Sequence, residues 1–403
     1  MIVPDDTRFS GHWIVAAQGM GKTTLLHTMI MDDLKKDACV ILIDAKGELT
    51  RPIQNLKTIQ DRLLLIDPRY PIAINPLDIP KDDISDAATQ LEYMFGALLK
   101  STITAKQSAL FRSILRAVLI AYPFPTLTIF QDILTTGGVE KSLISKLPQD
   151  LQNFFTVEFE TYNATRLELL WRLRYIMERD IVRTMFNAPK TEVHIKQAMD
   201  DGKVIIVNNS EAILGSEGSE FLGRFIVAQI WAAATARQLL PPTATRKPAY
   251  IYIDEADIVI SKDNKIASII DRCRSQKIAL ILAHQRIQQI DDSNVLSALS
   301  NCAIKYANVE PDDAKLMAPK LRTETDKLLD LPTGTFAAHI RGVTKQCVAF
   351  HVTPVDFSKY ETSLSERTVS AAPSAPAAQP EPPENTGDDA HTTPAVKRKK
   401  RKS

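Results

Sequence analysis

The sequence has few of the residues that mark secreted, disulfide-bonded or membrane-spanning proteins. Its 403 residues include only four cysteines, none in a C-x-x-C pair: Cys39, Cys273, Cys302 and Cys347. This spacing argues against a disulfide framework or a zinc site and suits a reducing cytosol. No apolar run reaches the ~18 residues of a membrane-spanning helix, and no signal-peptide pattern is present. We therefore expect a cytoplasmic protein without a membrane span, or one that is peripheral at the inner face of the membrane.

An excess of charge is missing too. Lys and Arg together number 49 and Asp and Glu 48, so the formal net charge is +1. No global field therefore points to a nucleic-acid partner, and any such surface must be local. The chain is 44% hydrophobic and 24% charged, which is typical of a globular protein, and it is long enough for two or three structural units.

The stretch 12–34 has the order strand, glycine-containing turn, lysine, threonine, helix. The apolar run 12–16 predicts the strand, and apolar residues at helical spacing follow the turn. The turn is typical of a phosphate-binding P-loop, in which backbone N–H groups and a helix N-terminus surround a polyphosphate. Lys22 would reach the β- and γ-phosphates, and the Thr23 hydroxyl would bind Mg²⁺. The predicted nucleotide contacts are Ala17, Gln18, Gly19, Met20, Gly21, Lys22, Thr23 and Thr24.

The loop is one residue short of the full pattern. Ala16 stands where the first glycine of G-x-x-x-x-G-K-[ST] is usual. An ordinary strand–turn–helix, whose glycines only relieve the turn, is the alternative interpretation. The strand before the loop and the amphipathic helix after it favour a nucleotide site.

Two carboxylates and an amide end later strands. Asp254 and Glu255 follow an apolar run about 230 residues after the P-loop, as in a Walker B site. Asp254 would hold the Mg²⁺ through water, and Glu255 would polarise the attacking water. Gln285 ends the next strand, where its amide could touch the γ-phosphate or its water. Ordinary polar strand ends are the alternative, and His284 beside Gln285 is more often an orienting or core histidine than a catalyst.

A polar turn, 44–48, follows the buried run 39–44. In open α/β sheets, ligands bind at this carboxyl edge of the strands. A solvated turn explains Lys46 and Glu48 equally well.

The rest of the chain predicts an α/β fold with a mostly parallel sheet. Apolar, β-branched runs typical of buried strands disappear between 82 and 187, where helical spacing dominates. The runs lie at residues 12–16, 39–44, 62–67, 202–209, 250–255, 278–283 and 303–306, with a helix at 221–237 and a late hairpin at 336–352. The predicted units are an ATPase core in two parts, 1–81 and 188–362, an all-helical insertion, 82–187, and a disordered tail, 363–403.

The predicted tail ends in six consecutive basic residues, 397–402. Such a block is usually a solvated tail. A mobile tether to phosphate backbones or acidic lipid is the functional alternative.

Phosphoryl transfer also needs a cation for the charge on the γ-oxygens. Many ATPases take it from a neighbouring subunit as an arginine finger. Arg272 and Arg274 end the helix before the run 278–283, and Arg179 and Arg183 end the helical insertion. Each alone is more often a surface salt-bridge partner.

With these motifs the chain resembles the FtsK/HerA superfamily of P-loop motors, and within it the conjugative coupling proteins of type IV secretion (the TraG/TraD type). The likeness covers most of residues 9–356. It rests on the order of motifs rather than on any one of them. The motifs are Gly19–Thr23, Ile43–Glu48, Asn75–Asp78, Gly202–Ile205 leading to Leu214-Gly215, Ile253–Asp257 and Ala283–Arg286.

The resemblance implies a RecA-like ATPase that uses ATP and Mg²⁺, assembles as a homo-oligomeric ring, usually a hexamer, and pumps DNA through its centre. It implies that Arg274 is the trans-acting arginine, with Arg183 a weaker match, beside the catalytic residues Lys22, Glu255 and Gln285. His284 departs from the family, which commonly has Thr at that place. Coupling proteins usually carry N-terminal membrane helices and HerA-type motors an N-terminal β-barrel. The sequence shows neither, so a membrane-anchored or secretion-channel partner stays open.

Three functions remain open at this point. The first is a ring-forming DNA translocase of the conjugative type, driven by ATP. The second is a viral or mobile-element genome-packaging ATPase of the same superfamily, with the same chemistry. The third is an ATP-dependent protein-secretion or assembly factor that does not act on DNA.

Overall fold

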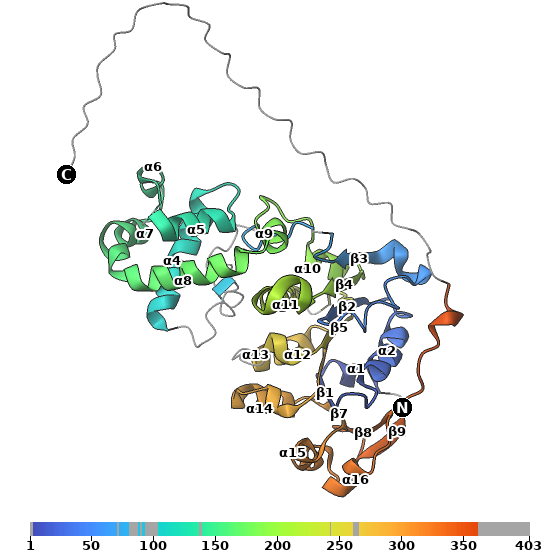
Figure 1. Cartoon of the computed structure of the whole chain (residues 1–403). Coiled ribbons are helices and arrows are strands. Elements are labelled where there is room, and N and C mark those ends of the chain that lie inside the picture. The colour runs from blue at the N-terminus through green and yellow to red at the C-terminus, as the bar shows by residue number, and fades with distance from the viewer. Residues whose placement is uncertain are drawn as a thin grey trace, which may run out of the picture. The chain divides into compact units, whose positions relative to one another are not determined.

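A single nine-stranded sheet forms the centre of the part of the chain that the computed structural model describes (Figure 1). Its strand order is β3-β4-β2-β5-β6-β1-β7-β8-β9. The predicted tail at 363–403 and most of residues 82–103 of the predicted insertion lie outside the described residues. Those residues are 3–70, 72–79, 88, 91–92, 104–136, 139–241, 243–260 and 266–361.

The first seven strands in chain order pair in parallel, β8 pairs antiparallel with β7, and β9 pairs antiparallel with β8. Their positions agree with the apolar runs of the sequence to within two residues, so the predicted α/β fold with a mostly parallel sheet is confirmed. The strands are β1 (His12–Ala16), β2 (Cys39–Asp44), β3 (Leu63–Ile66), β4 (Val204–Asn208), β5 (Ala249–Asp254), β6 (Ile278–His284), β7 (Ile304–Asn308), β8 (Thr335–Ile340) and β9 (Val348–His351).

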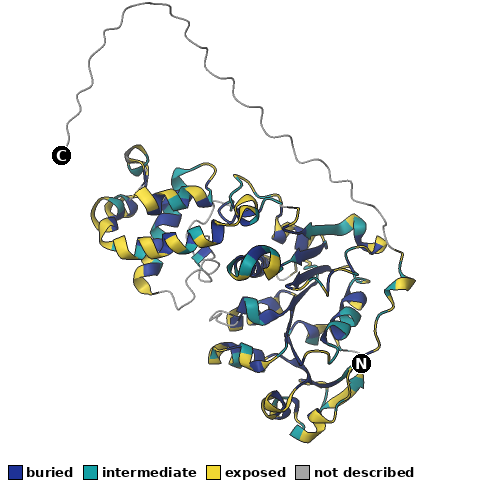
Figure 2. Cartoon of the chain, viewed as in Figure 1, coloured by how far each residue is buried: buried dark blue, intermediate teal, exposed yellow. Residues whose placement is uncertain are grey.

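Helices cover both faces of the sheet, which explains why the central strands are continuous apolar runs. Helices α11 (Glu211–Gln238), α12 (Ala256–Ile260), α13 (Ile266–Ser275) and α14 (Ser293–Ser300) lie on one face, and α1 (Asp5–Arg8) and α2 (Lys22–Asp33) lie on the other (Figure 1). The central strands are buried along most of their length, whereas β9 at the sheet edge is mostly exposed, and many exposed residues lie on the outer sides of the helices (Figure 2).

Alternate residues of each strand therefore belong to two hydrophobic cores, as the two-residue repeat of a strand requires. In β2, Ile41 and Ile43 pack in the core that includes α11, whereas Val40 and Leu42 pack in the core that includes Leu26 of α2. Burial of both faces fixes the register of these strands, because a one-residue shift would exchange the two sets of side chains.

Between β3 and β4, the described residues of the predicted insertion are helical, without a strand. A capping box at Thr104 begins α4, since the Thr104 hydroxyl accepts from the Gln107 N–H and the Gln107 amide accepts from the Thr104 N–H. The helices are α4 (Ala105–Ala121), α5 (Leu127–Thr136), α6 (Lys141–Ile144), α7 (Gln149–Asn153), η4 (Phe154–Glu158), η5 (Phe159–Tyr162), α8 (Asn163–Met177) and α9 (Asp180–Phe186).

Helix α11 is longer than the sequence indicates. It begins at residue 211 rather than 221 and has a break at Gly215, whose backbone is at φ 76° and ψ 168°. The first part of the helix is rich in serine and glycine, so its sequence lacks the apolar spacing that predicts a helix. The remaining elements are η1 (Lys57–Arg62), α10 (Ile195–Asp200), η6 (Ile287–Gln289), α15 (Pro311–Leu321), α16 (Thr325–Leu329) and η7 (Phe357–Lys359).

None of the helices in the described ranges combines the length and the apolar character that crossing a bilayer requires.

Candidate active site

The carboxyl ends of four adjacent strands bring the predicted site residues together. The strands β2, β5, β6 and β1 are neighbours in the sheet and run in parallel. The P-loop follows β1, the carboxylate pair ends β5, and Gln285 follows β6. This edge of a parallel sheet is where α/β proteins bind their ligands.

The P-loop turn depends on glycine at two positions. Gly19 has φ 79°, and Gly21, the residue that precedes α2, has φ 98°. A Cβ atom on Gly21 would also lie 3.2 Å from the Cα atom of Gly334, whose N–H donates to the Met20 carbonyl at 3.1 Å. Only glycine fits Gly21 without strain, for reasons of both backbone conformation and space.

The loop leaves backbone donors for an anion. Within the described part of the chain, the N–H groups of Gln18, Gly19 and Gly21 donate to no acceptor, whereas that of Ala17 donates to Asn308 at 2.9 Å. Gln18 and Gly19 are exposed, and Thr23 and Thr24 lie half-buried in the first turn of α2. Unpaired N–H groups at a helix N-terminus are the arrangement that binds phosphate groups.

Ala16 does not disturb this loop. It is the last residue of β1, is buried, and pairs in register with Asn308 of β7. It is not among the residues with positive φ. A glycine is therefore not required at this position.

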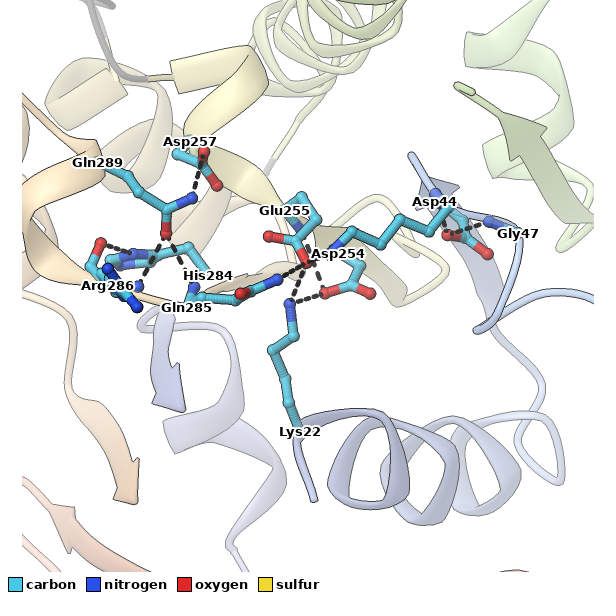
Figure 3. Close-up of polar contacts among 11 residues, drawn as sticks. Lys22, Asp44, Gly47, Asp254, Glu255, Asp257, His284, Gln285, Arg286 and Gln289 are labelled. Atoms are coloured by element: carbon cyan, nitrogen blue, oxygen red, sulfur yellow. Dashed lines mark hydrogen bonds and ion pairs between the residues drawn. The ribbon is translucent and has the colours of Figure 1, made fainter. Parts of the chain in front are cut away.

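Lys22 contacts both carboxylates of the pair (Figure 3). Its Nζ atom lies 2.7 Å from Asp254 Oδ1 and 2.8 Å from Glu255 Oε1, and all three side chains are at least 90% buried. Buried charges need such partners, because the interior solvates them poorly. The site therefore places one cation and two anions where a polyphosphate and a divalent cation need charges of both signs.

A single oxygen atom of Glu255 accepts three hydrogen bonds. The donors to Oε1 are Lys22 Nζ at 2.8 Å, Lys46 Nζ at 2.6 Å and Gln285 Nε2 at 2.7 Å. Burial alone raises the pKa of Glu255, but these donors and the Lys22 charge outweigh it and lower the pKa to about 2. Glu255 also has φ 50°, a left-handed conformation that few non-glycine residues adopt.

Lys46 is the site residue whose role the sequence left open. Asp44 at the end of β2 holds its turn, because Asp44 Oδ1 accepts from the N–H groups of Lys46 at 2.9 Å and Gly47 at 2.8 Å. The other oxygen, Oδ2, accepts from the N–H and the hydroxyl of Thr50. The polar turn after a buried strand was the signal in the sequence, but only the strand order brings Lys46 to Glu255.

His284 is buried and has a fixed tautomer. The Trp13 indole N–H donates to His284 Nε2 at 2.7 Å, so the proton of the neutral ring is on Nδ1, which donates to the Arg286 carbonyl at 2.9 Å. Burial lowers the pKa of His284 to about 4. His284 thus holds the turn that presents Gln285, which fits the orienting interpretation.

A second hydrogen-bonded pair connects the ends of β5 and β6. Gln289 Oε1 accepts from the N–H groups of Gln285 at 3.2 Å and Arg286 at 2.8 Å, and Gln289 Nε2 donates to Asp257 at 3.0 Å. Burial and the Glu255 charge raise the pKa of Asp257 to about 6. The sequence assigns no site role to either residue: Asp257 ends the motif Ile253–Asp257 and follows the carboxylate pair, and Gln289 lies beyond the quoted motifs.

The predicted arginines are not part of this cluster. Arg274 is exposed in the last turn of α13, which leads into the amino end of β6, at the sheet edge opposite the P-loop. Arg272 donates to the Thr235 hydroxyl, and Arg179 donates to the Ile213 carbonyl. Arg183 pairs with Asp180 on its own helix.

The parallel sheet, the P-loop and the carboxylate pair define a P-loop NTPase with a RecA-like core. Residues 12–230 match the family described as helicase HerA, central domain. The match spans more than half of the chain, and the protein belongs to this family. A comparison with curated protein sequences gives no significant match.

Several solved structures share the fold. The bacterial conjugative coupling protein TrwBdeltaN70 is 15% identical, over 89% of this chain and 87% of that one, with a TM-score of 0.65. The plasmid coupling protein TrwB in complex with ADP and Mg²⁺ is also 15% identical, over 88% of each chain, with a TM-score of 0.65. VirB4 of Thermoanaerobacter pseudethanolicus is 14% identical, over 89% of this chain and 93% of that one, with a TM-score of 0.59. The predicted RecA-like core and the FtsK/HerA relationship are confirmed.

Proposed function

We propose that this protein hydrolyses ATP with Mg²⁺ and uses the free energy to translocate DNA as a homo-oligomeric ring. The observation that carries the proposal is the convergence of Lys22, Asp254, Glu255 and Gln285 beside the P-loop, through contacts of 2.7 to 2.8 Å. Membership of the HerA family supports a motor function, and the fold shared with TrwB, one structure of which holds ADP and Mg²⁺, supports the nucleotide and the metal.

Each residue of the cluster has a definite role in this proposal. The amides of Gln18, Gly19 and Gly21 bind the phosphates from one side, and Lys22 Nζ binds them from the other. Thr23 and Asp254 hold Mg²⁺, which supplies charge compensation for the phosphate oxygens when it is bound. The oxygen ligands are of the kind that Mg²⁺ prefers.

Glu255 orients and polarises the attacking water. Its pKa of about 2 keeps the carboxylate ionised throughout the physiological range. Such a weakly basic carboxylate acts by accepting a hydrogen bond from the attacking water. It does not take the proton of that water before phosphoryl transfer begins. Gln285 donates to the same carboxylate at 2.7 Å. Its side-chain amide can therefore exchange hydrogen-bond partners when the γ-phosphate leaves, and so act as a sensor of hydrolysis.

The position of Arg274 supports the proposed ring. Arg274 projects from the sheet edge opposite its own P-loop, so a role for it in phosphoryl transfer requires a neighbouring subunit. A hexamer that encloses DNA, with a membrane-anchored or secretion-channel partner, is the assembly that the resemblance to coupling proteins favours. The conjugative function is preferred because coupling proteins share the fold over most of both chains.

The test is the rate of ATP hydrolysis with and without DNA. We expect DNA to stimulate the rate, and Lys22→Ala and Glu255→Gln each to lower it by about 100-fold or more. Ala16→Gly is the matched control in the same loop, and it should change the rate by less than about threefold, because Ala16 lies in a strand at ordinary dihedral angles.

Two outcomes would contradict the proposal in different ways. A rate that is unchanged in Lys22→Ala would exclude the site itself. A rate that is lost in Lys22→Ala but unaffected by DNA at every salt concentration would retain the ATPase and exclude the DNA translocase, and would favour a protein-secretion or assembly factor.

A further inference from the structure

Two buried basic residues lie side by side on β7 and β8, toward the β9 edge of the sheet. Lys305 of β7 and His339 of β8 are directly opposite each other in the antiparallel pairing. Opposite residues of two strands project from the same face of a sheet. Lys305 is 5% exposed and His339 is 4% exposed, although neither belongs to the proposed active site.

Neither side chain has the partners that such burial requires. Both ring nitrogens of His339 are buried and have no hydrogen-bond partner among the residues that the structure describes. The Lys305 ammonium donates to one acceptor, the Cys302 carbonyl, at 2.5 Å. Because a buried donor without an acceptor is unfavourable, these groups indicate a ligand that provides acceptors.

Three more cations lie close enough to Lys305 for their charges to act on it. Lys320 is in the last turn of α15, Arg322 follows that helix, and Arg341 follows β8. Burial, together with the charges of these three residues, lowers the pKa of Lys305 to about 8. Within the described ranges, none of the five basic residues forms an ion pair with a carboxylate. The cluster therefore lacks the negative charge that would balance it.

The backbone conformation of Arg322 is a further unusual feature of this cluster. It ends α15 with φ 57°, the left-handed position that usually holds glycine because a side chain there is strained. Its Nη1 atom has only one remote acceptor, the Lys345 carbonyl at 3.5 Å. The arginine thus gains little from its protein contacts to offset the strain.

We propose that Lys305, His339, Lys320, Arg322 and Arg341 form a site for a phosphate group. A phosphate oxygen would accept from a His339 ring N–H and from the free N–H groups of Lys305, while the arginines supply charge and planar donors. The site differs from the P-loop, because Lys305 is near the amino end of β7 whereas the P-loop follows the carboxyl end of its parallel neighbour β1. The phosphate belongs either to a free ion or nucleotide or to a nucleic-acid backbone.

The first experiment is thermal unfolding in sodium phosphate and in sodium chloride of equal ionic strength. The Lys22→Ala background removes the main side-chain contact of the P-loop with phosphate. We expect a phosphate-specific rise in Tm of about 2 °C at roughly ten times Kd. Arg322→Gly should abolish the rise and should still fold, because glycine suits the left-handed position.

The matched control is Lys315→Ala, an exposed lysine on the same helix, which should keep the full rise. Arg341→Ala provides an independent test of the cluster and should also reduce the rise. An equal rise in Tm in the parent Lys22→Ala protein and in both arginine variants would overturn the proposal. The same holds if phosphate and chloride give the same Tm.

The second experiment distinguishes the two sources of phosphate. It measures binding of a fluorescently labelled oligonucleotide, single- or double-stranded, by anisotropy at several salt concentrations. If the backbone is the ligand, Arg322→Gly should weaken binding and lower the salt slope by about one. Unchanged oligonucleotide binding, together with loss of the Tm response, assigns the site to a free phosphate or nucleotide.

Discussion

At the scale of single residues, the environment of Glu255 is the main determinant of the proposed chemistry. Lys46 is one of three donors to Oε1 and is the only one that resides on the β2 turn. We expect Lys46→Met to lower kcat for ATP about tenfold. The loss of one orienting hydrogen bond would raise the activation free energy by about 1.4 kcal/mol, which corresponds to a tenfold change in rate. KM for ATP should stay within about twofold, because Lys46 is on the β2 turn and not among the P-loop residues predicted to bind the nucleotide.

The control for this prediction is Lys46→Arg, which keeps a donor and should retain most of kcat. A steady-state titration with ATP gives both constants. An increase in KM at unchanged kcat would show instead that Lys46 binds the nucleotide in the ground state.

His284 gives the site a dependence on pH that affects stability. The unfolded residue titrates near pH 6.5 and the folded one near pH 4, so the folded state favours the neutral ring. A proton on Nε2 would face the Trp13 N–H, which already donates there. Stability from this residue is complete above pH 6.5 and decreases as the pH falls toward 4, by a total on the order of 3 kcal/mol.

Urea unfolding of the wild type and His284→Gln at several pH values tests this prediction, since glutamine can accept from Trp13 without gaining a proton. The difference between the two proteins should diminish as the pH falls from 6.5 to 4. Comparing variants is necessary because Asp257, with its pKa raised to about 6, acts in the opposite direction over part of that range. A constant difference would contradict the assignment.

The sequence predicted the residues that end strands or belong to a loop motif. Lys22, Asp254, Glu255 and Gln285 were identified because each follows an apolar run at the ligand-binding edge of a parallel sheet. The contact of Lys46 with Glu255 was not predictable, since it depends on β2 and β5 being neighbours in the sheet, and strand order is not readable from periodicity.

At the scale of elements, the break in α11 depends on one residue. Gly215 has dihedral angles that are nearly exclusive to glycine, and an added Cβ atom would lie 3.0 Å from Arg179 Nε. We expect Gly215→Ala to lower the free energy of unfolding by about 2 kcal/mol in chemical denaturation. Ser216→Ala, at the next and exposed position, should change it by less than about 0.5 kcal/mol.

A loss of stability in Ser216→Ala equal to that in Gly215→Ala would assign the effect to helix composition rather than to the break.

The element boundaries differ in how well the sequence predicts them, depending on whether a local pattern or tertiary packing determines them. Strands were located to within two residues because burial on both faces imposes continuous apolar runs. The first ten residues of α11 were missed because their helical state depends on packing, not on apolar spacing.

At the scale of the whole molecule, the position of Arg274 predicts a complementation experiment. If it acts on a neighbour, Arg274→Ala should lower ATP hydrolysis by about 1,000-fold and leave nucleotide binding nearly unchanged. An equal mixture of Arg274→Ala and Lys22→Ala subunits should regain about a quarter of the wild-type rate, because about one site in four then combines an intact P-loop with an intact arginine.

Arg183→Ala, the other candidate, should keep its activity and provides the matched control. If Arg183→Ala instead loses activity alone and regains it in a mixture with Lys22→Ala, the trans-acting role belongs to Arg183. No recovery in either mixture would exclude an active site shared between subunits.

The contact between Gly334 and the P-loop has a consequence for how the protein is made. The Met20 carbonyl and Gly21 rest on a residue that is translated roughly 300 positions later, and at ~5–20 residues per second this takes tens of seconds. β6 and β7, which flank β1, are also late products of translation. A ribosome-bound chain thus carries its phosphate-binding motif through the translation of about 300 further residues without the strands and the glycine that shape it. The proposed nucleotide site is complete only after β8 has emerged.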